Sequence, residues 1–549
     1  MVETRRFYLT SITVALAVLI GSTGGAGAAS HRASVGAASD TLIYGTTEEP
    51  DTLNPQITQL ATTYDLNAGI FDFLVRVDDK NNFIPDLATS WSVSSDNKTY
   101  TFHLRHGVKW ADGQPFTAKD VIFTYQQVVN PKNNNSTTQG WDQVDRAQAP
   151  DSYTVIFHTK QVFAPFLLYA GATTAILPAH YFQHSSSFVK SGNYNRDPFN
   201  RKVFGTGPYM VSEWKTADHI TLVPNPYYWG HKPYFKRIIF KIVPNTNTLL
   251  VQLRTNEVQV GGVDIQQVDQ AKSIPGKKLV IRPGQSWFHV DLKQWGFLRD
   301  QKVRLALDYA TPKVEIVQKV LHGMATPSYG DIAPGSWAYN PNVVKHPFDL
   351  NKAAKILADD GFTKGPDGIL RKNGQPFYLQ LWYISGSGTD EQVNVILKYY
   401  WSKLGIKVDL HQQNVSTIFG PSGPQFTKQM TGISYSWFNN NDPDDRLYWN
   451  SAQIPKTPTS PGGNVPAYFY PYNSFQKQID QLTNAGVATL DRGKRRAIYY
   501  KIQDLLAEQV PVIFLYWAPL IYLQPNNLQG FDPNAFMYGL FWNVERWHF

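Results

Sequence analysis

The chain has 549 residues, of which 42% are hydrophobic and 14% aromatic, with a formal charge of +8 and no cysteine. The apolar share is that of a globular protein and excludes disorder of the whole chain. The lack of cysteine excludes disulfides, zinc fingers, thiolate clusters and a lipid-bearing cysteine. The basic residues are spread along the chain rather than clustered, which argues against nucleic acid as a partner.

Residues 1–38 have the order of a secretory signal peptide followed by a spacer. Arg5 and Arg6 form the basic start, an apolar segment runs from Leu9 to Ile20, and Ala26-Gly27-Ala28 is a small-residue cleavage site. The apolar segment is too short to span a bilayer comfortably, so an uncleaved N-terminal anchor is the less favoured alternative. We therefore expect an exported protein, periplasmic or on the cell surface, that is soluble after cleavage.

In the first half of the chain, the hydrophobic pattern favours strands. Apolar residues alternate with polar ones on both sides of a Ser95–Lys98 turn, which predicts a hairpin. Thr117 and Asp120 fit a capping box at the start of an amphipathic helix. The predicted elements are a strand at 41–46, the hairpin at 91–93 and 99–104, the helix at 118–129, short strands within 209–241, and a helix at 246–257.

Helices alternate with strands in the second half. The helix predicted at 390–404 is stopped by Gly405 and followed at once by a strand at 406–410, a junction typical of α/β packing. Thr311 with Pro312 predicts the start of another helix, closed by Gly323. The remaining predictions are strands at 286–292 and 512–523 and helices at 300–309 and 491–508. Together these elements predict an α/β protein of at least two lobes.

Motifs that would mark an enzyme are not found. The sequence has no H-E-x-x-H, no G-x-S-x-G and no phosphate-binding loop. The run Asp442-Pro443-Asp444-Asp445 is compatible with a hard-cation site, but it is more typical of a turn that leads into a helix. We expect no catalytic residues, no metal and no cofactor. A secreted hydrolase stays open as an alternative, because paired carboxylates can come from distant parts of a chain.

Three blocks of sequence, in order along the chain, resemble one protein family. The first joins Leu87-Ala88-Thr89-Ser90-Trp91 to the stretch 107–121 (GVKWADGQPFTAKDV), the second joins 205–209 (GTGPY) to 225–230 (NPYYWG), and the third is 303–310 (VRLALDYA). The pattern resembles the extracytoplasmic solute-binding proteins of peptide and nickel ABC importers, the oligopeptide- and dipeptide-binding family (solute-binding family 5).

The resemblance implies a type II periplasmic-binding-protein-like fold with an extra subdomain and two hinge-linked lobes. Hinges would lie near Trp287–Val290 and Val512–Trp517. Lobe I would comprise residues 39–288 and 513–549, including the extra subdomain at about 86–204, and lobe II residues 289–512. A protein of this kind captures a solute between its lobes and delivers it to a membrane permease, and we expect it to be a monomer.

One position departs from the family pattern. Peptide-binding relatives carry an Asp that pairs with the α-amino group of the peptide, and the matching residue is Asn439. A neutral amide supplies no opposing charge, so charge-assisted recognition would need another carboxylate such as Glu48. The residues predicted to bind ligand are Asn439, Asn440, Trp437, Trp382, Tyr383, Glu48, Thr46 and Trp287.

The class of ligand therefore has two candidates. Peptides or peptide-like solutes follow from the resemblance. An oligosaccharide is the alternative, because aromatic faces stack on sugar rings while the Asn run offers amides to hydroxyl groups.

Overall fold

The computed structural model describes residues 40–549, except residues 59, 79–81, 137, 139, 420–421, 440, 458–461, 472 and 536–538. The predicted leader at 1–38 and the predicted site residue Asn440 lie outside the described residues. Within the described part of the chain, no helix has both the length and the apolar character that a membrane span requires.

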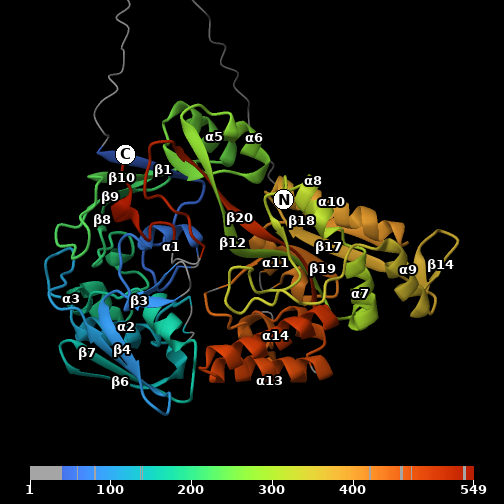
Figure 1. Cartoon of the computed structure of the whole chain (residues 1–549), viewed down its shortest axis with the longest axis horizontal. Coiled ribbons are helices and arrows are strands. Elements are labelled where there is room, and N and C mark those ends of the chain that lie inside the picture. The colour runs from blue at the N-terminus through green and yellow to red at the C-terminus, as the bar shows by residue number, and fades with distance from the viewer. Residues whose placement is uncertain are drawn as a thin grey trace, which may run out of the picture. The chain divides into compact units, whose positions relative to one another are not determined.

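The largest sheet joins the two halves of the chain through two long strands, β12 (Lys277–Leu292) and β20 (Val512–Pro525), which pair antiparallel (Figure 1). Its other strands are β1 (Thr41–Thr46), β8 (Tyr209–Lys215), β9 (His219–Pro224), β10 (Arg237–Ile242), β11 (Val260–Gly262), β13 (Thr326–Pro327), β17 (Tyr378–Ile384), β18 (Lys407–Gln413) and β19 (Gly432–Phe438). The order is β18-β17-β19-β12-β20-β11-β1-β10-β9-β8, with β13 beside β20. One end of β20 pairs with β11 and one end of β12 pairs with β19, so the long strands carry the sheet from one half to the other.

The start and the end of the described chain share one hydrophobic core. Leu42 on β1 and Phe240 on β10 are fully buried, and so are Phe541 and Trp547 near the C-terminus. The ring of Tyr44 meets that of Phe541 edge to face, with centroids 5.4 Å apart. The C-terminal tail therefore packs against the sheet of the first half.

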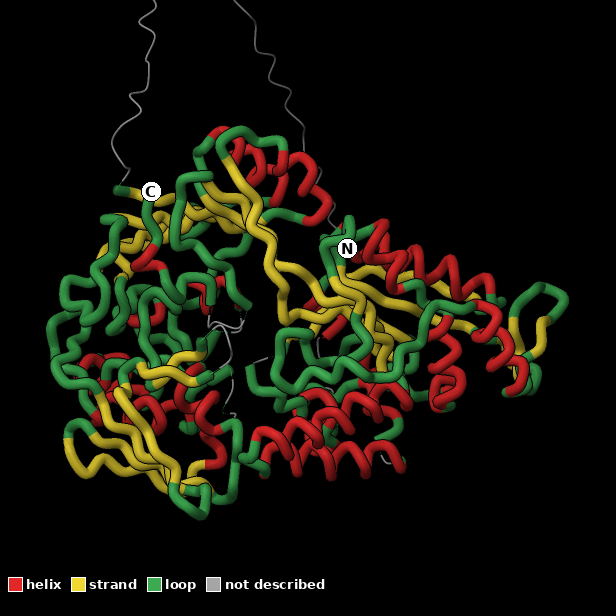
Figure 2. Tube along the Cα trace, viewed as in Figure 1, coloured by secondary structure: helices red, strands yellow, loops and turns green. Residues whose placement is uncertain are grey.

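A separate four-stranded sheet, visible in yellow in Figure 2, has its own core. Its order is β4 (Ala88–Val93), β5 (Thr99–Leu104), β7 (Thr154–Thr159) and β6 (Val144–Asp151). Phe102, Trp110 and Phe157 are fully buried beside it. The predicted hairpin is confirmed, and so is the capping box, in which the backbone N–H of Thr117 donates to Asp120 at 2.9 Å.

The second half of the chain has helices around β17, β18 and β19. β17 pairs parallel with both neighbours, and α10 (Gly388–Lys403) connects it to β18. Gly405 has a φ of +95°, and a Cβ there would lie 2.7 Å from the carbonyl oxygen of Gly368. The predicted helix–glycine–strand junction is confirmed, because only glycine fits that backbone and that space.

The other predicted helices and strands are present, most with ends shifted by a few residues, but β12 begins at Lys277, well before the predicted start at 286. Several further helices and small strands were not predicted from the sequence. The helices are α1 (Ala61–Asn67), α2 (Ala118–Val128), α3 (Ala179–His184), α4 (Ser186–Ser191), α5 (Thr246–Thr255), α6 (Val268–Lys272), α7 (Gln301–Tyr309), α8 (Lys313–Lys319), α9 (Leu350–Asp359), α11 (Val415–Phe419), α12 (Arg446–Trp449), α13 (Ser474–Ala488) and α14 (Arg492–Gln509). The small strands are β2 (Val75–Val77), β3 (Phe83–Pro85), β14 (Thr363–Lys364), β15 (Leu370–Lys372) and β16 (Gln375–Pro376).

One predicted helix start is wrong. Thr311 does not cap α8: its hydroxyl donates to the carbonyl of Leu307 at 2.7 Å and accepts from the indole N–H of Trp401 at 3.3 Å. Pro312 occupies the capping position, without a side-chain hydrogen bond, and the helix begins at Lys313.

The pairing of β12 with β20 is irregular where the two halves of the chain meet. The register shifts between Pro283 and Trp287 and again between Phe288 and His289. Pro283 lies opposite Pro519, and neither can donate a ladder hydrogen bond. A Cβ on Gly284 would lie 2.2 Å from the carbonyl oxygen of Ala518, so the two backbones approach closely there.

Candidate functional site

Three of the predicted site residues meet at the end of β19. Trp287 on β12 is paired with Trp437 on β19, and their ring centroids are 5.1 Å apart with perpendicular planes. The indole N–H of Trp287 donates to Oδ1 of Asn439 at 2.7 Å. The amide nitrogen of Asn439 donates to the backbone carbonyl of Asp331. Both ends of the Asn439 amide are therefore engaged by neighbours in the structure.

The aromatic side chains around Asn439 form a cluster. Tyr448 stacks on Trp437, with centroids 4.3 Å apart and planes at 14°. Trp449 lies 5.8 Å from Trp437, and both Trp287 and Trp449 are buried. Next to them Phe438 is 55% exposed, although it is apolar. Such a surface offers contact area to a solute and ring faces that attract cations.

Two buried aspartates lie beside this cluster. Asp331 is 0% exposed and Asp445 is 3% exposed. One oxygen of Asp331 accepts a hydrogen bond from the indole N–H of Trp449 at 2.6 Å. Burial raises the pKa of Asp331 to about 6, and burial together with the negative charge of Asp331 raises that of Asp445 well above its usual range.

The run of acidic residues that begins at Asp442 contains two ion pairs with arginines. Asp442 receives both terminal nitrogens of Arg495, at 2.5 and 2.6 Å. Asp444 receives two hydrogen bonds from Arg446, both at 2.8 Å. Among the described residues, no group of three or more acidic or histidine side chains could hold a metal ion. The first two carboxylates of the run are thus neutralised by arginines, and Asp445 follows them directly as the residue before α12.

Trp382 and Tyr383 lie on β17, the strand that pairs with β19. Trp382 stacks on His411 with centroids 4.7 Å apart, and it packs with Trp437 against a small core. Tyr383 is 6% exposed and is therefore buried. Trp382 therefore reaches the aromatic cluster from the neighbouring strand, whereas Tyr383, the next residue on β17, points to the other face of the sheet.

Thr46 and Glu48 lie in the other half of the chain, at the end of β1. The backbone N–H of Glu48 donates to the hydroxyl of Thr46 at 3.3 Å, and the Glu48 carboxylate accepts a hydrogen bond from Thr62 at 2.8 Å. Glu48 is exposed, whereas Thr46 is buried. They therefore lie in another part of the large sheet than Asn439, because β1 pairs with β10 and β11.

Sequence reasoning missed four residues of this region: Asp331, Asp445, Tyr448 and Trp449. The sequence places Asp445 in a run interpreted as a cation site or, more typically, a turn, and the aromatic pair follows it within one helical turn, a signal that could have been used. Asp331 is 108 residues from Asn439 in the sequence, so no local pattern could have joined them.

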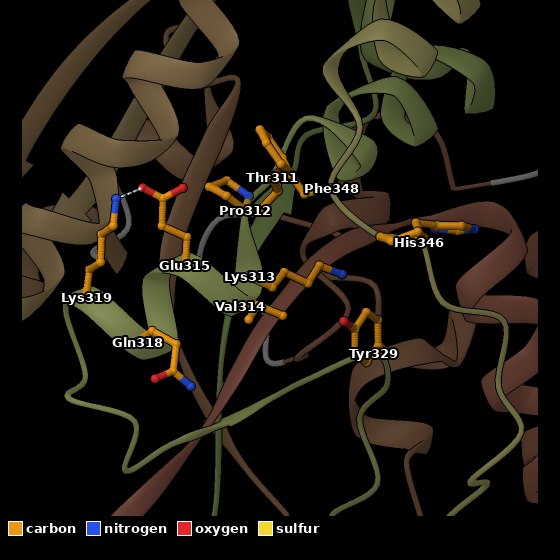
Figure 3. Close-up of a pocket in the computed structure, with 11 residues that line it drawn as sticks. Thr311, Pro312, Lys313, Val314, Glu315, Gln318, Lys319, Tyr329, His346 and Phe348 are labelled. Carbon is orange, nitrogen blue, oxygen red and sulfur yellow. Dashed lines mark hydrogen bonds and ion pairs between the residues drawn. The ribbon is translucent and has the colours of Figure 1, made fainter.

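A pocket of about 420 Å³ lies elsewhere, beside α8 (Figure 3). Lys313 points toward Tyr329 there, with its Nζ 4.8 Å from the ring centroid. The same nitrogen is 2.8 Å from Asp308, which also contacts His346 at 2.7 Å. Burial opposes ionisation of Asp308, but the two basic neighbours outweigh it and lower its pKa. The pocket contains none of the predicted site residues, and its buried ion pairs hold α7 and α8 to the loop at 344–348.

The structure consists of two α/β halves that are joined by a pair of long strands, and aromatic and acidic side chains lie beside the junction. This arrangement defines the class of two-lobed solute-binding proteins. The sequence matches the family described as "Bacterial extracellular solute-binding proteins, family 5 Middle" over residues 82–457, more than half of its length. The chain belongs to this family, as its sequence blocks predicted.

Individual relatives extend the likeness over nearly the whole chain. The oligopeptide-binding protein AppA of Bacillus subtilis (strain 168) is 28% identical over 517 residues, 92% of this chain and 91% of the relative. The dipeptide-binding protein of Escherichia coli (strain K12) is 27% identical over 505 residues, 86% of this chain and 89% of the relative. The structure of Bacillus subtilis AppA in complex with a nonapeptide matches with a TM-score of 0.78 and 26% identity, covering 93% of this chain and 99% of that one.

Proposed function

We propose that this chain is the substrate-binding component of an ABC importer that captures oligopeptides. The likeness to an oligopeptide-binding protein over more than nine-tenths of both chains carries the proposal. Such a protein is exported, catalyses no reaction and hands its solute to a membrane permease. It acts as a monomer.

The solute is held between two lobes that close around it. Lobe I consists of residues 39–288 and 513–549 with the extra subdomain at about 86–204, and lobe II of residues 289–512. The shared core of the chain ends supports the composition of lobe I. The irregular pairing at Pro283–His289 supports a hinge there, because missing ladder hydrogen bonds let the long strands bend.

In this proposal the lobes present different surfaces to the peptide. Lobe II offers the aromatic cluster around Trp437 with the exposed Phe438 and Leu447, which are 55% and 40% exposed. Lobe I offers Thr46 and Glu48 at the end of β1. Apolar area supplies most of the affinity, and a few polar groups orient the chain of the ligand.

Calorimetry with purified mature protein tests the proposal. The titrants are an equimolar library of penta- to nonapeptides, a cello-oligosaccharide as the saccharide alternative, and buffer. Saturable binding of peptides without binding of the saccharide is expected. Binding of the saccharide alone would replace the proposal, and mass spectrometry showing sustained cleavage of the peptides would favour the hydrolase alternative.

A further inference from the structure

Three carboxylate oxygens beside the aromatic cluster are buried without a hydrogen-bond partner among the described residues. They are Oδ1 of Asp331 and both oxygens of Asp445. A buried carboxylate normally accepts hydrogen bonds or pairs with a cation, since its desolvation is otherwise uncompensated. Their presence in the interior therefore points to a group that satisfies them in the working protein.

The nearby arginines are engaged by other carboxylates. Arg495 donates hydrogen bonds to Asp442 and Arg446 donates to Asp444, each through two guanidinium nitrogens. Asp331 and Asp445 lie close enough to each other that, in addition to burial, the negative charge of Asp331 raises the pKa of Asp445. Burial raises the pKa of both groups, so a cation that pairs with them would favour the loss of a proton.

The surroundings of the two aspartates suit an organic cation. The Trp449 indole, which donates to Asp331, belongs to the cluster with Trp437 and Tyr448, whose ring faces attract positive charge. The backbone of Asp331 holds the amide of Asn439. The acidic pair is thus connected by one hydrogen bond to the position at which the resemblance places ammonium recognition.

We propose that Asp331 and Asp445 form the anionic subsite for a cationic group of the solute, an ammonium or a guanidinium, and that they release a proton to solvent when it binds. The inference rests on the proposed function and names the chemistry of its ligand. It assigns the negative charge that recognises the cation to Asp331 and Asp445 rather than to position 439.

Access to the pair follows from the contacts of its neighbours. Asp444, next to Asp445 in the chain, accepts a hydrogen bond at 3.4 Å from Tyr169, and Arg446 lies 5.0 Å from the ring of Phe163. Tyr169 and Phe163 belong to the subdomain of lobe I, so part of the cover over this region comes from the opposite lobe. Opening of the lobes removes that cover and lets a solute approach.

The test compares charged and neutral peptides on matched variants. The probes are pentaalanine amide with a free N-terminus, its N-acetyl form, and an N-acetyl peptide with one central lysine, so that a terminal and a side-chain ammonium are distinguished. The proteins are the wild type, Asp331→Asn, Asp445→Asn and the control Asp65→Asn. The control removes a carboxyl whose pKa is also raised by burial, to about 7, but which lies in lobe I beside Leu540.

We expect the wild type and Asp65→Asn to bind one of the ammonium peptides at least about tenfold more tightly than the neutral peptide. In Asp331→Asn and Asp445→Asn that preference should fall below about threefold, because a neutral amide cannot pair with the cation. Calorimetry in two buffers of different ionisation enthalpy should show proton release by the wild type on binding, and less by Asp445→Asn.

The other outcomes contradict either the proposed subsite or the proposed function. If the wild type binds all three peptides equally, or if both Asn variants keep the full preference, the subsite is wrong and peptide capture stands. If the wild type binds no peptide, the proposed function fails and the subsite fails with it. Should an Asn variant not fold, the absence of proton release by the wild type would by itself refute the inference.

Discussion

At the scale of single residues, the amide of Asn439 is fitted to its place by a donor on one side and an acceptor on the other. Trp287 donates to its oxygen, and its nitrogen donates to the carbonyl of Asp331. In Asn439→Asp a carboxylate oxygen would face that carbonyl, so we expect a loss of about 1–3 kcal/mol of stability at pH 8. The loss should shrink at pH 5, because the variant's carboxyl, with its pKa raised, then carries a proton that it can donate.

Urea unfolding at both pH values measures this effect. Asn473→Asp is the matched control, since Asn473 caps α13 through its oxygen and Asp caps a helix equally well. Equal loss in the two variants, or a loss at 439 that does not depend on pH, would show that the hydrogen bond to Asp331 is unimportant.

A second prediction at the scale of single residues concerns Asp65 and the dependence of folding stability on pH. Burial raises its pKa from 3.8 in the unfolded chain to about 7 in the folded protein. The folded state therefore binds the proton more tightly, and stability from this group is present below about pH 4 and is lost as pH rises toward 7. Asp65→Asn keeps an acceptor for the N–H of Leu540, which lies 2.7 Å away. We expect the variant to gain stability over the wild type between pH 4.5 and pH 7.5, by up to a few kcal/mol at about 1.4 kcal/mol per pKa unit. Parallel pH profiles of the melting temperature for the two proteins would contradict this.

At the scale of elements, the pairing of β12 with β20 depends on Gly284, which has no side chain. A Cβ at Gly284 would lie 2.2 Å from the carbonyl oxygen of Ala518 on the partner strand, so Gly284→Ala must push the strands apart. We expect a cost of about 1–3 kcal/mol. Gly262→Ala is the control, because Gly262 also pairs with β20 and a Cβ there meets nothing within 4 Å. Denaturant midpoints compare the two, and a similar, small change in both would show that the close approach at Gly284 is not needed.

The elements themselves were largely predictable, because their signals are local. The capping box at Thr117 and the Gly405 stop were recognised from a few adjacent residues, and both have the predicted geometry. Thr311 failed as a helix cap because its hydroxyl is engaged by Leu307 and by the distant Trp401, which a sequence pattern does not show.

The site was predictable only in part, for the same physical reason. Trp437 and Asn439 were found because they belong to one segment that resembles a family motif. Trp287 was predicted as well, and it reaches Asn439 through the pairing of β12 with β19, whereas Asp331 comes from a loop 108 residues away. Burial, which raises the pKa of Asp331 and Asp445, depends on that packing and is not encoded in any short pattern.

At the scale of the whole molecule, contacts between the proposed lobes should govern how readily it opens. The backbone N–H of Ala164 donates to the carbonyl of Val487 at 2.7 Å, and the guanidinium of Arg446 lies 5.0 Å from the ring of Phe163. Each joins the subdomain of lobe I to lobe II. A bound solute adds to these contacts, and at about a hundredfold over its dissociation constant it should stabilise the closed protein by roughly 2.7 kcal/mol.

Removing one of these contacts separates closure from binding. In Arg446→Ala the guanidinium over Phe163 and the ion pair with Asp444 are both lost, so the unliganded protein should have a larger radius of gyration than the wild type and release peptide faster. Arg201→Ala is the control, because Arg201 lies 3.7 Å from the ring centroid of Trp214 within lobe I, and its loss should change neither property. Small-angle scattering with and without saturating peptide, together with stopped-flow dissociation, provides the measurements. A radius of gyration that is the same for Arg446→Ala and the wild type, and that peptide does not reduce in either, would refute both the interlobe contact and the hinge.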